Sequence, residues 1–216
     1  MSPASDPSYP EDVRAALLAA ARCELAEHGV GGISLRAIAQ RAGVSRATPK
    51  WHFGDRAGLL SAVAVEGFHR LADDLRAAAA AAGEGPAERL TALGRAYLNF
   101  GLDDTALFDL MFRSELLRRD DPALVAARAA SYSVLSDTTA EITAREQLGD
   151  DRLASELSFL AWACVHGLVA LVRDGALQAF TGAPTHAEAE QRAYDLADTF
   201  TNNLLPNRTS QAGPRR

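Results

Sequence analysis

Basic side chains gather in one short stretch of a chain that is otherwise acidic. From Ile33 to Arg56 there are five basic residues against one acid, a local charge of +4. The rest of the chain holds 17 basic and 27 acidic residues, a charge of −10, which brings the total to −6. Because Lys and Arg neutralise phosphates, this stretch indicates a nucleic-acid surface that the total charge alone would argue against. The five basic residues are Arg36, Arg41, Arg46, Lys50 and Arg56.

Two short helices must position these side chains. Ser34 suits the N-cap of a helix over Leu35–Ala42, and after a glycine turn Ser45 suits the N-cap of a helix over Arg46–Phe53. Pro49 falls in the fourth position after the Ser45 cap, where the helix loses at most its first hydrogen bond. This spacing is typical of a helix-turn-helix, whose second helix enters a DNA major groove.

The flanking sequence predicts helices throughout. A first helix should begin at Pro10 and stop at Gly29, and Asp55 should cap a long helix that runs into the alanines at 77–82. Apolar spacing predicts five more helices, over residues 86–100, 105–118, 122–147, 151–173 and 185–205. We therefore expect an all-α fold of about nine helices. It divides into a three-helix domain over 10–56, a C-terminal helical domain over 57–205 joined to it by the long connecting helix, and flexible tails at 1–9 and 206–216.

Several other classes of protein find no support. Cys23 and Cys164 are far apart and the five histidines are dispersed, so we expect no disulfide, metal site or cofactor. No Walker, GxSxG, HExxH or GxGxxG pattern occurs, and we expect no catalytic residue. With no signal peptide and no run of about 18 apolar residues, we expect a cytoplasmic protein without a membrane partner.

Residues Ile33–Phe53, followed by Gly54–Leu60, resemble the DNA-binding domain of TetR-type transcriptional regulators. The shared elements are a Thr or Ser cap, an Ile-Ala pair, an Ala-Gly-Val-Ser turn, an aromatic-His-Phe ending and a Leu-Leu pair. Ala47 and Lys50 depart from the Gly and Tyr common in that family, so its base preference cannot be transferred. By resemblance the DNA-contacting residues are Ser34, Arg36, Ser45, Arg46, Ala47, Thr48, Lys50, Trp51, His52 and Arg56.

The resemblance also implies individual roles. Arg36 would reach a base or a phosphate from the first helix of the motif, and His52 would touch a phosphate. Arg56 would meet a phosphate at the start of the connecting helix, where backbone N–H groups favour anions. The alternative is that the arginines form an ordinary solvated face and that Phe53 and Trp51 simply pack, with Phe53 the better core candidate.

A second resemblance covers the C-terminal region. The segments around Tyr97, Ala106–Phe112 and Trp162…His166-Gly167 are similar to an effector and dimerisation domain of TetR-type proteins that carries a Trp…His-Gly signature. It implies that residues 57–205 bind an effector and dimerise, with the last two helices forming a four-helix bundle with their copies. The small residues that would allow this close approach are Ala161, Ala163, Gly167 and Ala170.

Aromatic residues at helical spacing are the candidates for a ligand cavity. The alternative is that they are plain core, and for Trp162 and His166 that they pack and share a hydrogen bond. The candidate ligand-binding residues are Phe68, Tyr97, Phe100, Phe108, Met111, Phe112, Tyr132, Phe159, Trp162 and His166.

Together the motif and the two resemblances imply a homodimeric, ligand-responsive transcriptional repressor. By resemblance, a small-molecule effector would release it from a roughly palindromic, double-stranded DNA operator. The competing hypothesis is an all-helical protein that binds small molecules or partner proteins and has no DNA-binding activity, and an enzyme is a distant third.

Overall fold

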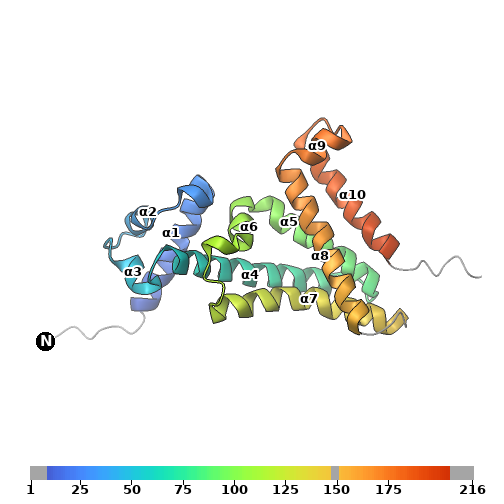
Figure 1. Cartoon of the computed structure of the whole chain (residues 1–216), viewed down its shortest axis with the longest axis horizontal. Helices are drawn as coiled ribbons and strands as arrows, with labels where there is room; N and C mark the ends of the chain where they lie inside the picture. Colours follow the sequence, from blue (N-terminus) through green and yellow to red (C-terminus); the bar gives the residue numbers. More distant parts are fainter. Residues whose placement is uncertain (1–8, 147–150, 205–216) are drawn as a thin grey trace, which may run out of the picture. The chain divides into compact units, whose positions relative to one another are not determined.

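The computed structural model describes residues 9–146 and 151–204, and in these ranges the chain is all helical (Figure 1). The predicted fold class is confirmed. The described residues form ten α-helices rather than nine. The additional helix is α9 (Ala176–Thr181), which lies between Gly175 and Gly182, both at φ 70. Six residues are too few to produce a recognisable apolar period, so the sequence pattern missed this helix.

The other helices lie close to the predicted ranges. They are α1 (Tyr9–Gly32), α2 (Leu35–Arg41), α3 (Thr48–Phe53), α4 (Arg56–Ala81), α5 (Pro86–Asp103), α6 (Thr105–Phe112), α7 (Pro122–Glu146), α8 (Asp151–Arg173) and α10 (His186–Leu204), with one 3-10 turn, η1 (Ser114–Leu116). The predicted tails, except Tyr9, and the ends of two predicted helices at Gln147 and Leu205 lie outside the described residues.

Two boundaries differ from the prediction for identifiable reasons. In α1 the helical path breaks at Gly29, as predicted, because this glycine takes φ 64, but one more helical turn follows as far as Gly32. The helix expected over 105–118 ends at Phe112. Beyond it the chain forms η1 and becomes extended at Leu117, which is buried.

The chain divides into two compact units. Of the described residues, the first unit holds 9–70 and 104–129, and the second holds 71–103, 130–146 and 151–204. The helix α4 therefore contributes its first part to one unit and its last part to the other. This division by packing cuts across the predicted functional domains, because α6 and the start of α7 pack with the N-terminal helices.

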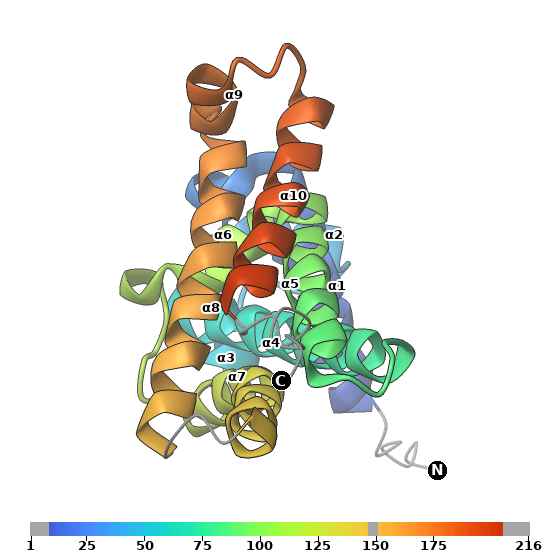
Figure 2. The same ribbon diagram turned by 90° about the vertical axis from the view of Figure 1, so that its right-hand side faces the viewer.

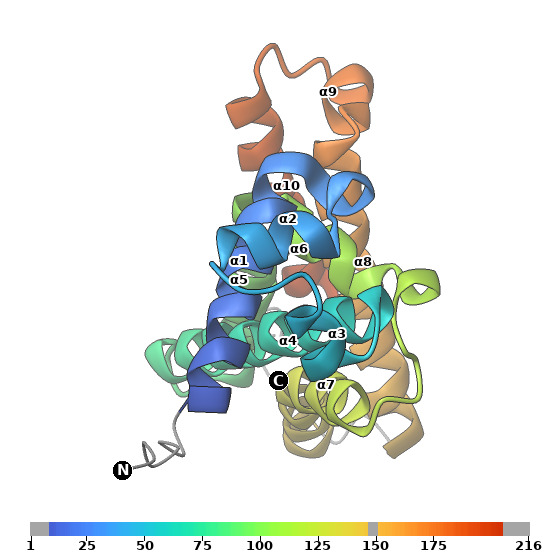
Figure 3. The same cartoon turned by 90° about the vertical axis from the view of Figure 1, so that its left-hand side faces the viewer.

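The first unit is built around α1. It packs against α2 and α6, and α2 packs against α3 (Figure 3). Its core contains Leu17, Ile38, Phe53 and Leu59, all buried. Because these apolar residues come from α1, α2, α3 and α4, burial ties the short helices to the long ones.

The second unit is built around three helices, α5, α8 and α10, which pack against one another, with α9 packed on α8 and α10 (Figure 2). Ala189, Ala193 and Ala197 recur at every fourth position of α10 and are buried. Alanines at this spacing form a flat stripe that lets helices approach closely. At the edge of this contact the guanidinium of Arg95 on α5 forms an ion pair with Asp198 on α10.

The apolar character of α8 exceeds the prediction. Its segment Arg152–Arg173 contains an 18-residue stretch of mean hydropathy 1.6, which is long and apolar enough to cross a membrane by length and composition. The expected absence of an uninterrupted run of about 18 apolar residues still holds, because Ser158 and His166 interrupt the segment, but a hydropathy average tolerates such residues. Core helices of soluble proteins meet the same criterion, although only 28% of the stretch is buried.

The core of the first unit gives a direct test of this packing. Leu59 has no exposed surface, and Val125 on α7 is 51% exposed. Leu59→Ala should lower the free energy of unfolding by about 2–5 kcal/mol, because it leaves a cavity as well as losing buried apolar surface. Val125→Ala, the matched control, should change it by less than about 0.5 kcal/mol. Urea denaturation measures both, and equal effects would contradict the packing described here.

Candidate nucleic-acid interface

The helix-turn-helix is present, and its first helix is capped as predicted. The amide of Ala37 donates to Oγ of Ser34 at 3.2 Å, at the start of α2. After α2 the chain turns at Gly43, which takes φ 68, a conformation that favours glycine. The amide of Val44 then donates to the carbonyl of Ala39 at 3.0 Å, which closes the turn.

The start of the second helix differs from the prediction. α3 begins at Thr48, with Ala47 as an N-cap that makes no side-chain bond, so the assignment of Ser45 as cap was wrong. Instead, Ser45 and Thr48 form a turn, with their hydroxyl oxygens 2.8 Å apart and the Thr48 amide donating to the Ser45 carbonyl. The reason is Pro49, which fits the first helical turn, where its missing N–H costs no bond.

The five basic residues of the motif divide into two kinds. Arg41 is paired with Glu24, its Nε lying 2.8 Å from Oε1, and with Glu27. Arg56 donates through Nη2 to the carbonyl of Val30 at 2.7 Å and through Nε to that of Ile33. Both guanidinium groups thus hold the scaffold together, and the local charge of +4 overstates what is available to a partner.

The other three basic side chains point into solvent. Arg36 on α2, Arg46 in the turn and Lys50 on α3 are exposed, and none has an acidic partner within the described parts of the chain. Ser34, Ser45 and Ala47 are exposed beside them, and Thr48 is half-buried. This exposed cation set, Arg36, Arg46 and Lys50, is what the motif offers to phosphates and bases.

An exposed aromatic ring lies on α3, next to Lys50. Trp51 is 76% exposed and meets the ring of His52 edge-on, with 4.6 Å between ring centroids. Phe53 is buried, as predicted, and the guanidinium of Arg14 lies over its ring. The six residues of α3 therefore bury Pro49 and Phe53 and present Lys50 and Trp51.

The junction between α3 and α4 contains contacts that sequence reasoning missed. Asp55 caps α4 as predicted, accepting from the Gly58 amide at 2.8 Å. Its Oδ1 also lies 3.0 Å from Nη2 of Arg118. The Gly58 amide and then the Arg118 guanidinium lower the pKa of Asp55. No spacing pattern connects Arg118 with this junction, because it follows α6, far along the chain.

The candidate ligand-binding residues fall into both units. In the first unit Phe68, Phe108 and Met111 are buried and Phe112 is half-buried, with the rings of Phe68 and Phe112 packed edge to face. Phe100 in the second unit is also buried. Their burial fits the plain-core alternative that the helical spacing left open.

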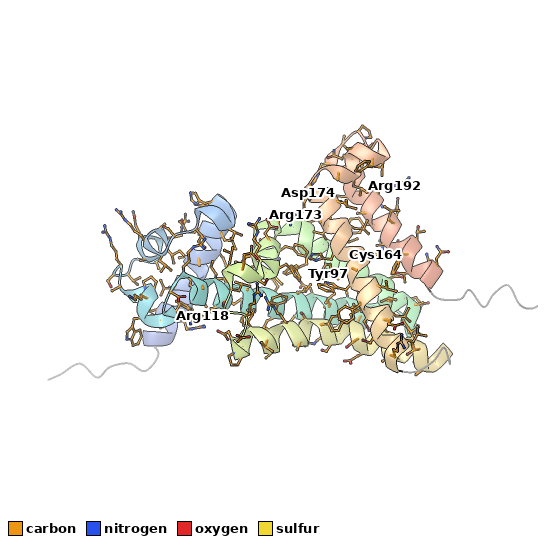
Figure 4. The ribbon with its side chains drawn as sticks, viewed as in Figure 1. Tyr97, Arg118, Cys164, Arg173, Asp174 and Arg192 are labelled. Atoms are coloured by element: carbon orange, nitrogen blue, oxygen red, sulfur yellow. The ribbon has the colours of Figure 1, made fainter. Side chains whose placement is uncertain are left out.

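Hydrogen bonds connect Tyr97, Trp162 and His166 in the second unit. Tyr97 is labelled in Figure 4. The indole Nε1 of Trp162 donates to the Tyr97 hydroxyl at 3.0 Å, and that oxygen lies 2.9 Å from Nδ1 of His166. The Tyr97 hydroxyl therefore accepts one bond from Trp162 and makes a second with Nδ1 of His166, in which the donor depends on the His166 tautomer. Burial, and then the charge of Arg173, lower the pKa of His166, and burial raises that of Tyr97. Trp162 and His166 thus each take part in a hydrogen bond with Tyr97.

Next to these three residues lie two further rings. Phe159 is 54% exposed, and its ring centroid lies 5.4 Å from that of Tyr132. The Tyr132 hydroxyl is buried without a hydrogen-bond partner among the described residues. An unpaired buried hydroxyl costs about 1–3 kcal/mol, so a polar group supplied by a ligand or a water would be stabilised here.

One group of side chains has the ligand types of a metal site. Potential ligand atoms of Glu24, Glu27 and His28 lie within 4.8 Å of one another. Both carboxylates already pair with Arg41, so the arrangement is explained as an ion-pair cluster that holds α2 on α1.

Family models match both the N-terminal and the C-terminal part of the chain. Residues 17–63 match the family model "Bacterial regulatory proteins, tetR family", and residues 90–195 match "Tetracyclin repressor-like, C-terminal domain". The C-terminal match does not specify the Trp…His-Gly class, which stays a prediction. A search of curated proteins gave no match.

Solved structures are similar along almost the whole chain. A protein with unknown function from Rhodococcus sp. RHA1 is 34% identical, with 94% of this chain and 98% of that chain covered and a TM-score of 0.75. A TetR family transcription regulator from Marinobacter aquaeolei VT8 is 20% identical (90% and 97% covered, TM-score 0.61). The fatty acid degradation regulator FadR from Bacillus halodurans is 18% identical (90% and 96%, TM-score 0.59). The last two likenesses concern the fold.

The environment of His166 predicts a pH dependence. Because its pKa is lower in the folded than in the unfolded chain, protonation favours unfolding. The free energy of unfolding should be greatest above about pH 6.5 and should fall as the pH drops below that value. Proton NMR should give a His166 midpoint below about 6.5, because burial and the charge of Arg173 disfavour the protonated ring. A midpoint at or above 6.5 in the unmodified protein would contradict the described environment.

Proposed function

This chain belongs to the TetR family of bacterial regulatory proteins and is a DNA-binding transcriptional regulator, and from that premise we propose that it is a repressor released from a roughly palindromic operator by a small-molecule effector. The observation that carries the proposal is the exposed cation set on α2, the turn and α3, beside the exposed Trp51. Cations without an internal partner remain available to phosphates and base edges.

α3 is the proposed recognition helix. Lys50 and Arg46 have the chemistry to bind guanine edges or phosphates, and Arg36 reaches the same surface from α2. Trp51 offers apolar contact with sugar or thymine methyl groups, and His52 a phosphate contact. Ser34, Ser45, Ala47 and Thr48 complete the proposed interface. Arg56 takes part only through those guanidinium N–H groups that do not bind the carbonyl groups of Val30 and Ile33.

The effector site is proposed within residues 57–205, on the aromatic residues of the second unit. The support is the buried, unpartnered hydroxyl of Tyr132 and the exposed ring of Phe159 beside it. Tyr97, Trp162 and His166 form the polar wall of this site. Since α4 contributes residues to both units, effector binding would shift the equilibrium between conformations of differing DNA affinity.

Dimerisation is proposed through α8 and α10. Leu160, Ala163 and Leu171 are exposed on one face of α8, and Leu196 is exposed on α10. A second copy of these helices would cover this apolar face, so we propose a cytoplasmic homodimer. In this proposal α8 is apolar because it contacts a second protein chain and not because it contacts lipid. Two recognition helices would then meet operator half-sites about 34 Å apart or a multiple of that distance.

The proposed DNA contacts can be counted through salt dependence. Each phosphate contact contributes about 0.9 to the slope of log binding constant against log salt concentration. Arg46→Ala and Lys50→Ala should weaken binding to a DNA fragment from upstream of the protein's own gene. Where the replaced side chain contacts a phosphate, the variant should also reduce this slope. Fluorescence anisotropy between about 50 and 200 mM NaCl measures both quantities.

Arg152→Ala on α8 is the matched control, because Arg152 is more than four-fifths exposed and pairs only with Glu156 in the described structure. It should leave affinity and slope unchanged. If Arg46→Ala and Lys50→Ala also leave both unchanged, the assignment of α3 is wrong. If the unmodified protein binds no genomic fragment, the repressor proposal fails as a whole.

The proposed dimer surface has its own test. A carboxylate at Leu160 or Leu171 would be buried without a partner, so Leu160→Glu and Leu171→Glu should convert the dimer to a folded monomer. Val125→Glu, at a similarly exposed position on α7, should leave the dimer intact. Light scattering gives the masses, and dimers in all three variants would refute the interface.

A further inference from the structure

Arg118 lies directly against the junction through which the recognition helix joins α4. The junction consists of Gly54, which ends α3 at φ 78, and Asp55, which caps α4. The conformation of this junction sets the orientation of the six-residue helix α3 relative to α4. All the groups that follow belong to the first unit.

The guanidinium of Arg118 fills the space over two glycines. A Cβ added to Gly54 would lie 2.8 Å from Nη2 of Arg118, and one added to Gly58 would lie 2.9 Å from Cζ. A side chain at Gly58 would also approach the carbonyl oxygen of Phe53 to 2.0 Å. All three approaches are shorter than real Cβ contacts. The Phe53 carbonyl is backbone, so Gly58 permits the close approach of α3 to α4, and the flexible Arg118 guanidinium occupies the space over both glycines.

The backbone of Arg118 is anchored independently of its side chain. Its amide donates to Oγ of Ser61 at 2.8 Å, and Ser61 on α4 is fully buried. The preceding Leu117 is also buried. The segment after α6 is therefore fixed to α4, and from this anchor the guanidinium reaches Asp55 at the start of the helix.

We propose that Arg118 is a positioning residue for DNA binding: without touching DNA, its ion pair with Asp55 holds the α3–α4 junction in the conformation that presents the recognition helix. The segment that follows α6 thereby influences the affinity of the recognition helix α3 for DNA. This inference rests on the proposed operator binding by α3. The competing role for a half-exposed arginine is a direct phosphate contact.

Two variants separate these roles. Arg118→Met keeps the aliphatic stem and the backbone bond to Ser61 but removes the ion pair. Asp55→Asn keeps an oxygen acceptor for the Gly58 amide and removes the same ion pair from the other side. If only local charge mattered, Asp55→Asn would strengthen DNA binding, because it removes a negative charge beside the phosphates. Positioning predicts that it weakens binding.

The experiment measures operator affinity of the full-length protein against NaCl concentration, with dimer mass and urea denaturation recorded for each variant. Arg118→Met and Asp55→Asn should each weaken binding at least about fivefold, with the salt slope unchanged, and the double variant should be no weaker than the worse single one. Arg119→Met, which removes a neighbouring charge with no acidic partner in the described structure, should bind like the unmodified protein.

Other outcomes overturn the proposal in distinguishable ways. A slope lowered by about 0.9 in Arg118→Met assigns Arg118 to a phosphate contact. Unchanged or stronger binding by Asp55→Asn removes the positioning role, and this result holds even if Arg118→Met does not fold. Absence of DNA binding by the unmodified protein refutes the proposed operator binding itself, and with it the basis of the positioning role.

Discussion

The proposed recognition helix, α3, is too short to be stable by itself. Six residues form fewer than two turns, whereas isolated helices shorter than about 12–15 residues are marginal in water. α3 therefore depends on its buried side and its two ends: Pro49 and Phe53 enter the core, and the Ser45–Thr48 turn precedes it. The residues of α3 that face the core cannot contact DNA, so the surface of α3 that remains for recognition is small. Its direction is set by the surrounding helices.

The same constraint accounts for the uneven use of arginine. Arg41 joins α2 to α1 through Glu24 and Glu27, and Arg56 binds the carbonyl groups at the end of α1. These pairings neutralise or occupy cations that the composition alone would count toward DNA binding. What remains exposed is a small set over α2, the turn and α3, in a chain of net charge −6. An acidic protein with one basic surface disfavours DNA contact through its other faces, so charge distribution helps to orient the molecule on its partner.

Features that depend on neighbouring residues could be predicted from the sequence, and features that depend on distant ones could not. The caps at Ser34 and Asp55, the turn at Gly43 and the burial of Phe53 follow from local patterns and are present. The Ser45 cap failed because the preference of Pro49 for the first helical turn outweighed a good capping residue. The partners of Arg41 and Arg118 come from other helices, and the hydrogen bonds of Tyr97 reach α8 from α5, so only the fold could reveal them.

The proposed function depends on two copies of α3 that bind one operator. Methylation-interference footprinting of the operator, which reports guanines contacted in the major groove, measures these contacts. We expect two short patches on one face of the duplex, related by approximate two-fold symmetry and centred about 34 Å apart or a multiple of that distance. A single patch, or interference without any preferred site, would show that α3 does not bind in this way.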